Sequence, residues 1–223
     1  GKPVAGFSIE RLGDLKTIEM AARKAKEFVH YASELPRVPI KWDEIWVSTK
    51  CGESDTTSGL ASNPTVGRVF ERLEKNGNTL IFGETTEVTG AEDKIMEQCA
   101  TPEIAAQFKA AFDDYQQLVE SQGVSLLGTQ PTEGNIRGGL STIDEKALGN
   151  VEKMGRCTIV GFLEPAEAPK KPGLHFMDSS SAAAEMVTLC CAAGAVLHLF
   201  TTGQGNIIGN KIEPVIKLSA NPL

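Results

Sequence analysis

The sequence has few aromatic residues, no excess of positive charge and no long hydrophobic run. Only 6% of its 223 residues are aromatic, which disfavours a platform that stacks the bases of single-stranded nucleic acid. Twenty-two Lys and Arg against 29 Asp and Glu give a net charge of −7, which disfavours a surface for nucleic-acid phosphates. The longest apolar runs, such as residues 192–200, are too short to cross a bilayer. We therefore expect no nucleic-acid partner, no membrane association and a cytoplasmic location.

Several short motifs of metal and nucleotide sites are also missing. The five cysteines form no CxxC pair, and the three histidines form no HxH or HxxxH spacing. An odd set of cysteines without such spacing favours a reducing compartment over a disulfide framework. The Gly-rich segment 202–206 lacks the GxGxxG spacing, and no Walker motif is present, so we expect no nucleotide cofactor.

What the sequence does contain is a regular alternation of helical and strand patterns. Apolar residues at helical spacing predict helices over residues 14–35, 63–75, 101–122, 142–154 and 181–193. Asn63, Thr101 and Thr142 are the expected N-caps of three of these helices. Short apolar runs predict strands over residues 44–48, 79–82, 158–163, 174–177, 195–200 and 214–223, with an irregular segment at 127–140. This alternation favours an α/β fold: a mostly parallel sheet with helices on both faces, a Rossmann-like three-layer sandwich without a dinucleotide fingerprint.

The length of the chain fits one or two domains. We expect a single α/β catalytic-region domain over residues 1–223, with a possible internal boundary near residues 124–140. The chain begins with Gly rather than Met, and its last strand pattern stops abruptly. We therefore interpret it as a fragment of a longer chain.

Four predicted strands run directly into loops that are rich in hydroxyl, amide and acidic side chains. These loops are residues 51–59, 83–87, 178–181 and 201–206. Because the carboxyl ends of parallel strands meet at one edge of a sheet, where ligands bind, we expect the loops to converge there. Hydroxyl and backbone N–H groups of residues 54–57 and 179–181 can cradle an anion, but ordinary helix capping explains the same residues.

Acidic residues and one cysteine beside these strand ends are candidate metal ligands. The expected ligands are Cys51, Glu84, Glu87 and Glu92. Carboxylates bind hard divalent ions and a thiolate favours a softer one, so Fe(II) is the expected cofactor, with Mn or Mg as alternatives. A solvated acidic turn at a helix start and a buried apolar cysteine are the alternative readings.

Two basic residues near the irregular segment are candidates for substrate chemistry. Arg137 lies in the Gly-rich loop 134–139 and can hold a carboxylate or sulfonate with two hydrogen bonds. Lys146, one turn into the following helix, is a candidate base if it is buried. A solvated helix lysine is the alternative for Lys146.

Six segments taken together resemble the altronate and galactarate dehydratase family. They are residues 51–55, 83–92, 134–143, 145–149, 176–178 and 201–206, in the family's order and across nearly the whole chain. Sugar-acid dehydratases of this family usually carry Gly-Gly after the cysteine and Thr-Pro-Gly-Tyr after Met-Asp. This chain instead has Glu53 after Gly52, and three serines at 179–181. These departures, with residues 163–169, resemble the branch of the family that acts on (2R)-sulfolactate.

The resemblance implies an iron-linked lyase that performs an elimination on a small 2-hydroxy acid. The expected reaction converts (2R)-sulfolactate to pyruvate and sulfite; the alternatives are a sugar-acid dehydratase and a noncatalytic core domain of such an enzyme. It also implies a small anionic substrate and assembly as a homo-oligomer, with a small partner subunit, or both. Members of the family are longer than this chain, so activity of the fragment alone is not expected.

The resemblance places the motifs, and we assign roles to the residues within them. The expected catalytic residues are Lys146 as the base, Arg137 and Asp178. The expected substrate contacts are Ser54, Asp55, Thr56, Asn135, Ser179, Gln204 and Asn206.

Overall fold

The computed structural model describes residues 2–127 and 129–222, and its contacts divide the chain into two units, residues 1–40 and residues 41–223. The expectation of one α/β domain over the whole chain stays a prediction. The segment 124–140, where an internal boundary was considered, falls within the second unit.

The first unit consists of an extended segment and one helix, α1 (Asp14–Glu34). The hydroxyl of Thr17 donates to the carbonyl oxygens of Gly13 (2.7 Å) and Ser8 (3.2 Å), which holds the extended segment beside the start of the helix. Thr17 is the buried residue of α1, whereas Leu15 is 78% exposed and Ile18 is 62% exposed. The apolar stripe predicted for this helix is therefore not covered within residues 2–40.

The second unit is built on a six-stranded sheet in which every strand pair is parallel. The strand order is β3-β4-β2-β1-β5-β6. The strands are β1 (Val47–Cys51), β2 (Thr79–Phe82), β3 (Ile159–Leu163), β4 (Gly173–Met177), β5 (Leu197–Thr201) and β6 (Val215–Leu218). The predicted parallel sheet is thus confirmed. Because all six strands point the same way, the loops that follow them reach one edge of the sheet.

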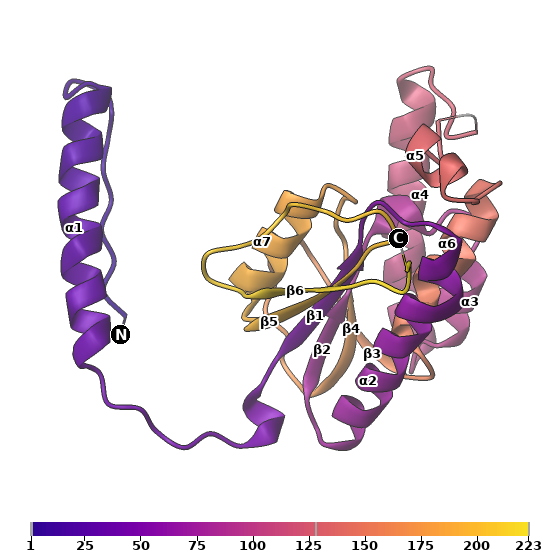
Figure 1. Ribbon diagram of the computed structural model, residues 1–223, viewed down its shortest axis with the longest axis horizontal. Helices are drawn as coiled ribbons and strands as arrows, with labels where there is room; N and C mark the ends of the chain where they lie inside the picture. Colours follow the sequence, from indigo (N-terminus) through magenta and orange to yellow (C-terminus); the bar gives the residue numbers. More distant parts are fainter. Residues whose placement is uncertain (1, 128, 223) are drawn as a thin grey trace. The chain divides into compact units, whose positions relative to one another are not determined.

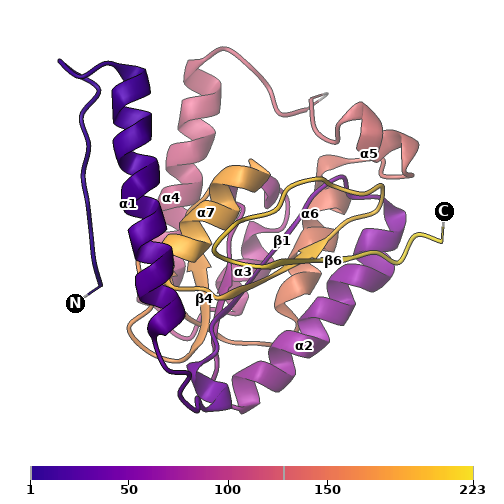
Figure 2. The same ribbon diagram turned by 60° about the vertical axis from the view of Figure 1, so that its left-hand side comes forward.

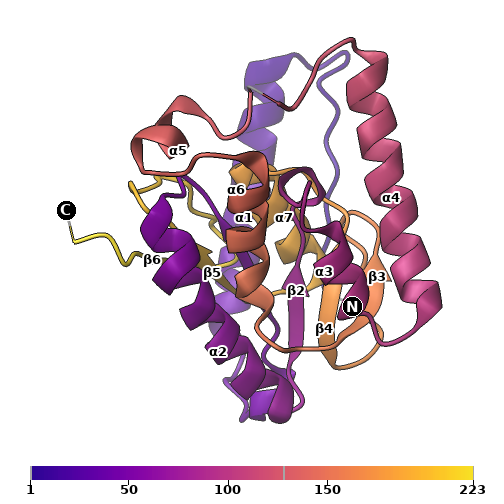
Figure 3. The same ribbon diagram turned by 90° about the vertical axis from the view of Figure 1, so that its right-hand side faces the viewer.

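Helices cover both faces of this sheet, as predicted (Figures 1 and 3). One face carries α2 (Asn63–Lys75), α3 (Glu92–Glu97), α4 (Pro102–Ser121) and α6 (Ile143–Val151), and the other carries α7 (Ala183–Ala193). The short helix α5 (Glu133–Arg137) lies beyond the end of the sheet at which β1 finishes (Figure 2).

Successive side chains of the central strands point to opposite faces of the sheet, and this divides the core into two clusters. On β4, Phe176 faces the larger cluster, where its ring lies 5.6 Å from Phe82 and 4.8 Å from Phe108, edge to face in both cases. Its neighbour Met177 faces the smaller cluster under α7, together with Ile81 of β2. Strands buried on both faces in this way give the continuous apolar runs seen in the sequence.

The first strand begins later than its apolar pattern predicts. Residues 44–48 were expected to form it, but Trp42–Glu44 form a 3₁₀ turn and the strand begins at Val47. The side-chain amide of Asn78 donates to the carbonyl oxygens of Trp42 and Ile45 (2.8 Å to Ile45). A side chain from the start of β2 therefore binds these carbonyls in place of a neighbouring strand.

The predicted irregular segment contains a short helix, and one predicted cap is different. Thr132 and Asn135 form a reciprocal capping box that starts α5. Thr142 caps α6 as expected, accepting from the backbone N–H of Glu145 (3.1 Å). Asn63, however, does not cap α2, because a helical turn (Ser58–Ser62) precedes it without a break.

Candidate active site

A cavity of about 250 Å3, here called the strand-end cavity, lies at the carboxyl edge of the sheet beside β1. Its walls come from the loops that follow β1, β2, β4 and β5, from the segment around α5, and from α6. Its lining residues are Lys50, Cys51, Gly52, Glu53, Ser54, Glu87, Gln130, Thr132, Asn135, Lys146, Ser181, Ala183 and Asn206. Cavities for drug-sized ligands begin at roughly 300 Å3, so this volume suits a small substrate.

The loops expected to converge do so. The backbone N–H of Glu84, after β2, donates to the hydroxyl of Ser179, after β4 (3.0 Å). The side-chain amide of Gln204, after β5, donates to the carbonyl oxygen of Gly134 in α5 (2.6 Å). The hydroxyl of Thr56, after β1, donates to the carbonyl oxygen of Gly138 (3.0 Å). Hydrogen bonds therefore tie four strand-end segments and α5 into one edge.

The predicted site residues divide into three groups. The first group lines the strand-end cavity: Cys51, Ser54, Glu87, Asn135, Lys146 and Asn206. The second group lies in the same loops without lining the cavity: Asp55, Thr56, Glu84, Ser179 and Gln204. The third group does not line the cavity and has contacts of its own: Glu92 and Arg137, which lie outside these loops, and Asp178, which lies in the loop after β4.

The third group has other surroundings. Arg137 is exposed on α5. Glu92 accepts a hydrogen bond from the backbone N–H of Gly90 (2.7 Å) at the start of α3. Asp178 accepts from the hydroxyl of Thr85 (2.6 Å). Roles for these three residues at the strand-end cavity stay predictions that this geometry does not support.

Helix capping explains part of the hydroxyl-rich loop after β1. The carboxylate of Asp55 is buried and accepts from the backbone N–H of Ser58 (3.0 Å) and the hydroxyl of Thr57 (2.7 Å). This is the ordinary hydrogen bonding of an acidic residue at a helix start. Ser54 is different, because it lines the cavity.

Beneath the cavity, two lysines meet one carboxylate. Glu84 lies 3.0 Å from the ammonium group of Lys50 and 2.9 Å from that of Lys153, and no side chain of the three is more than 2% exposed. Burial raises the pKa of Glu84, but the charges of Lys153 and Lys50 outweigh it and lower that pKa to about 2. Burial likewise lowers the pKa of Lys153, but Cys51 and Glu84 beside it produce a net increase. We call these three residues the Lys50–Glu84–Lys153 cluster.

The backbone at two strand ends is held in the left-handed region. Glu53 has a φ of 52° and Glu84 a φ of 69°, a conformation that costs a residue with a Cβ atom roughly 1–2 kcal/mol. At Glu84 this turn directs the chain from β2 toward Ser179, while its carboxylate reaches the two lysines. Such strain persists where the surroundings fix it, often at functional sites.

The expected metal ligands do not form a metal-binding group. Cys51 and Glu84 are neighbours (Sγ to Oε2, 3.8 Å), but the oxygens of Glu84 already hold two ammonium groups, where a cation would have to lie. Glu87 is paired with Lys146, and Glu92 lies at the start of α3. Among residues 2–127 and 129–222, no three His, Cys, Asp or Glu side chains gather as ion ligands. The residues present here therefore do not fit Fe(II), which stays a prediction.

The candidate base is half of an ion pair. The ammonium nitrogen of Lys146 lies 2.8 Å from Glu87 and 2.6 Å from the amide oxygen of Gln130, and all three residues line the cavity. Only 10% of the Lys146 side chain and 12% of the Glu87 side chain are exposed. The alternative of a solvated helix lysine is therefore wrong.

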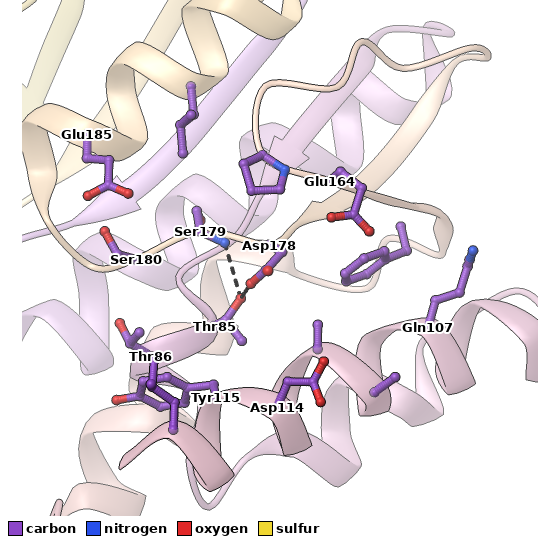
Figure 4. Close-up of a pocket in the computed structure, with 16 residues that line it drawn as sticks. Thr85, Thr86, Gln107, Asp114, Tyr115, Glu164, Asp178, Ser179, Ser180 and Glu185 are labelled. Atoms are coloured by element: carbon purple, nitrogen blue, oxygen red, sulfur yellow. Dashed lines mark hydrogen bonds between the residues drawn. The ribbon is translucent and has the colours of Figure 1, made fainter. Parts of the chain in front are cut away.

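A second, larger cavity of about 670 Å3 lies between α4 and α7 (Figure 4). Four carboxylate residues line it: Asp114, Glu164, Asp178 and Glu185. Among the described residues that line it, none is Lys, Arg or His. A doubly anionic substrate would be repelled here, whereas the strand-end cavity presents Lys50 and Lys146.

A buried Ser-His-Glu group lies elsewhere on the sheet. The hydroxyl of Ser48 lies 2.6 Å from Nδ1 of His198 and donates to Glu213 (2.6 Å). The three residues are 0% exposed and line neither of the two cavities described above. Despite its composition, this group has no access to a substrate. His198, within β5, is therefore a residue of the core.

Sequence reasoning missed Lys50, Asn150 and Lys153. Lys50 lies outside the strand predicted over residues 44–48, so the sequence pattern did not indicate its full burial, which lysine almost never shows unless it is paired. Asn150 accepts from the thiol of Cys51 (3.3 Å) and also from Lys153. The pairing itself depends on Glu84, which comes 34 residues later in the chain, and no local pattern shows it.

The family model for the C-terminal region of D-galactarate/altronate dehydratases matches residues 42–223. The chain belongs to this family. The predicted resemblance is thus confirmed. The matched region coincides with the second unit, which holds the sheet and the strand-end cavity.

Three characterised members of the family are similar to this chain. It is 60% identical, over its full length, to the (2R)-sulfolactate sulfo-lyase subunit beta of Chromohalobacter salexigens, of which it covers 58%. It is 30% identical to the galactarate dehydratase (L-threo-forming) of Escherichia coli, over 97% of this chain and 42% of that protein. It is 31% identical to the altronate dehydratase of Bacillus subtilis, over 92% of this chain and 41% of that protein. The chain therefore spans less than two thirds of the length of these relatives.

No helix within residues 2–127 and 129–222 is both long and apolar enough to span a membrane.

Proposed function

We propose that this protein is a lyase that eliminates sulfite from (2R)-sulfolactate and leaves pyruvate. The observation that carries the proposal is the 60% identity, over the whole chain, to a relative named as a subunit of (2R)-sulfolactate sulfo-lyase. The small volume of the strand-end cavity and the two lysines in its lining, Lys50 and Lys146, support a small acid with two anionic ends.

The reaction needs a proton acceptor and a means of stabilising charge. Sulfolactate carries a hydroxyl group on the carbon next to its carboxylate and a sulfonate on the following carbon. Removal of the proton beside the carboxylate places negative charge on that carboxylate, and the pair of electrons then expels sulfite from the neighbouring carbon. The resulting enol takes up a proton and becomes pyruvate. Fixed cationic donors lower the energy of the charged intermediate.

The Lys146–Glu87 pair is our candidate for the proton transfers. Transfer of one proton across the 2.8 Å contact would leave Lys146 as a neutral amine, able to take the substrate proton. Glu87 would hold the other proton in the same cavity. Among the neutral polar side chains of the lining, Ser54, Asn135, Ser181 and Asn206 would orient the substrate.

The proposal extends to the surroundings of the enzyme. The relative from Chromohalobacter salexigens is named a subunit, and we propose that this protein likewise works in an assembly, as a homo-oligomer or with a small partner subunit. A cytoplasmic location and an Fe(II) cofactor belong to the same proposal. No step above depends on the metal, because the described residues do not fit it.

A sugar-acid dehydratase is the second candidate, favoured by the 30% and 31% identities to galactarate and altronate dehydratases. Six-carbon sugar acids are longer than sulfolactate and are harder to accommodate in about 250 Å3. The test is an anaerobic assay of the full-length protein with (2R)-sulfolactate, galactarate and altronate. Sulfite and pyruvate in equal amounts from sulfolactate are expected. Formation of 2-keto-3-deoxy acids, with no sulfite, would overturn the proposal in favour of dehydration.

A further inference from the structure

The Lys50–Glu84–Lys153 cluster carries more positive than negative charge. Among the described residues, Lys50 and Lys153 each form an ion pair with Glu84 and with no other carboxylate. Cys51 lies beside this cluster, with its Sγ 3.3 Å from the amide oxygen of Asn150. Two ammonium groups therefore share one carboxylate in a place where no side chain is more than 2% exposed. An unbalanced buried charge is costly unless a partner neutralises it.

This excess charge reaches the strand-end cavity through one residue. Lys50 lines the cavity, whereas Glu84 and Lys153 do not. The other lysine in the lining, Lys146, already faces the carboxylate of Glu87 at 2.8 Å. Lys50 therefore brings the excess positive charge of the Lys50–Glu84–Lys153 cluster to the cavity, whose remaining carboxylate, that of Glu53, is exposed to solvent.

We propose that an oxyanion of the substrate binds at Lys50 and completes the charge balance of the Lys50–Glu84–Lys153 cluster. The shared chemistry is a carboxylate or a sulfonate, since either presents oxygens that accept hydrogen bonds from an ammonium group. The identity of the acid rests on the proposed function, but the oxyanion site does not. Glu84 sets the strength of the site by neutralising one of the two lysines. The cluster supplies this positive charge without a metal ion.

The test is calorimetric titration of the full-length protein with sulfite and, separately, with pyruvate, at neutral pH and in the presence of EDTA. The first ligand probes a sulfur oxyanion and the second a carboxylate. Binding of either in EDTA is expected, and the tighter ligand identifies which end of the substrate lies at Lys50. If neither binds the wild-type protein, the inference is overturned.

Substitution of the lysines and of the glutamate in the cluster should change the affinity for the anion in opposite directions. Lys50→Met should weaken binding at least about ten-fold, because it removes a charged hydrogen-bond donor. Lys153→Met should weaken it less, because Lys153 does not line the cavity. Glu84→Gln should tighten binding, because it leaves both lysines unneutralised. Lys109→Met is the control, since Lys109 is exposed and paired with Asp113.

Lys50→Arg keeps the charge and should bind within about three-fold of the wild type, which separates loss of the donor from loss of the fold. Circular dichroism checks that each variant is folded. Unchanged binding in a folded Lys50→Met, or equal weakening in Glu84→Gln and Lys50→Met, would overturn the inference. An enzyme that binds sulfite or pyruvate at Lys50 but releases no sulfite from sulfolactate would refute the proposed function and leave the oxyanion site intact.

Discussion

Lys146 and Glu87 face each other across 2.8 Å, and both line the strand-end cavity. One residue comes from α6 and the other from the turn after β2, so the fold brings together a lysine and a glutamate that lie 59 residues apart in the chain. Four predictions follow from this site and from the core around it.

Replacement of Lys146 by Met should lower kcat for sulfite release about 100-fold, the smaller end of the usual contribution of general acid–base catalysis. KM should change much less, because Lys50 keeps its charge in the cavity. Lys109→Met is the matched control, an exposed lysine in an ion pair on α4. A Lys146→Met enzyme with unchanged kcat would show that the base lies elsewhere.

Replacement of Cys51 by Ala should leave the iron content of the anaerobically purified full-length protein unchanged. The reason is that Cys51 contacts Asn150 and a carboxylate already held by two lysines, which is no place for a cation. Elemental analysis of wild type and variant, side by side, measures it. Loss of iron in Cys51→Ala would instead make the thiol a ligand, as first expected.

Glu213 should make the free energy of unfolding fall as the pH rises toward 7. Burial raises the pKa of Glu213 to about 7 from an ordinary value of 4.5, although its bond from Ser48 acts to lower it. The folded protein therefore binds this proton more tightly than the unfolded chain. The stability that Glu213 contributes is complete below pH 4.5 and is lost as the pH rises toward 7, by about 3 kcal/mol.

Glu213→Gln removes this dependence. The free energy of unfolding of the variant minus that of the wild type should therefore be larger at pH 8 than at pH 5. Urea unfolding of both proteins at the two pH values measures this difference. Burial, followed by the charge of Lys50, lowers the pKa of His198 to about 3, so neutral His198 stabilises the fold above pH 6.5 and loses that contribution below it. Both proteins share this opposite effect, so it cancels in the difference. Glu185→Gln, on an exposed side chain, should keep the wild-type pH dependence. Parallel curves for wild type and Glu213→Gln would refute the assignment.

Gly67 should not tolerate a methyl group. A Cβ atom there would lie 2.4 Å from the carbonyl oxygen of Glu152 and 2.9 Å from the backbone nitrogen of Gly155. Gly67→Ala gains about 1 kcal/mol of helix propensity, but the overlap with backbone should outweigh it and leave a net loss of about 2 kcal/mol. Gly209→Ala, where no atom lies within 4 Å, is the control. A Gly67→Ala protein at least as stable as wild type, by urea unfolding, would contradict this packing.

The order of helices and strands could be predicted from the sequence because each element carries its own signal. Thr101 and Thr142 cap their helices as expected, and the buried strands show their apolar runs. The start of β1 could not be predicted, since a side chain from the next strand, Asn78, binds the carbonyls before it. The local pattern also predicts Asn63 as a helix cap, but a helical turn precedes it in the structure.

The edge of the sheet where the cavity lies was predictable, but the charges within it were only partly so. Parallel strands bring their carboxyl ends together, which gathers Cys51, Ser54 and Asn206 as expected. Which carboxylate meets which lysine is decided by contacts between distant segments. Glu84 was therefore assigned to a metal, whereas it binds Lys50 and Lys153.

Asn63 lies within a continuous helical stretch, and its side chain is committed at both ends. Its amide nitrogen donates to the carbonyl oxygen of Gly149 in α6 (2.7 Å), and its amide oxygen accepts from the hydroxyl of Thr201 at the end of β5 (2.6 Å). One rigid planar group thus sets the spacing between the helix that bears Lys146 and the strand that leads to Asn206. The distance between these two walls of the strand-end cavity is therefore fixed from within the core, by one side chain that does not itself line the cavity.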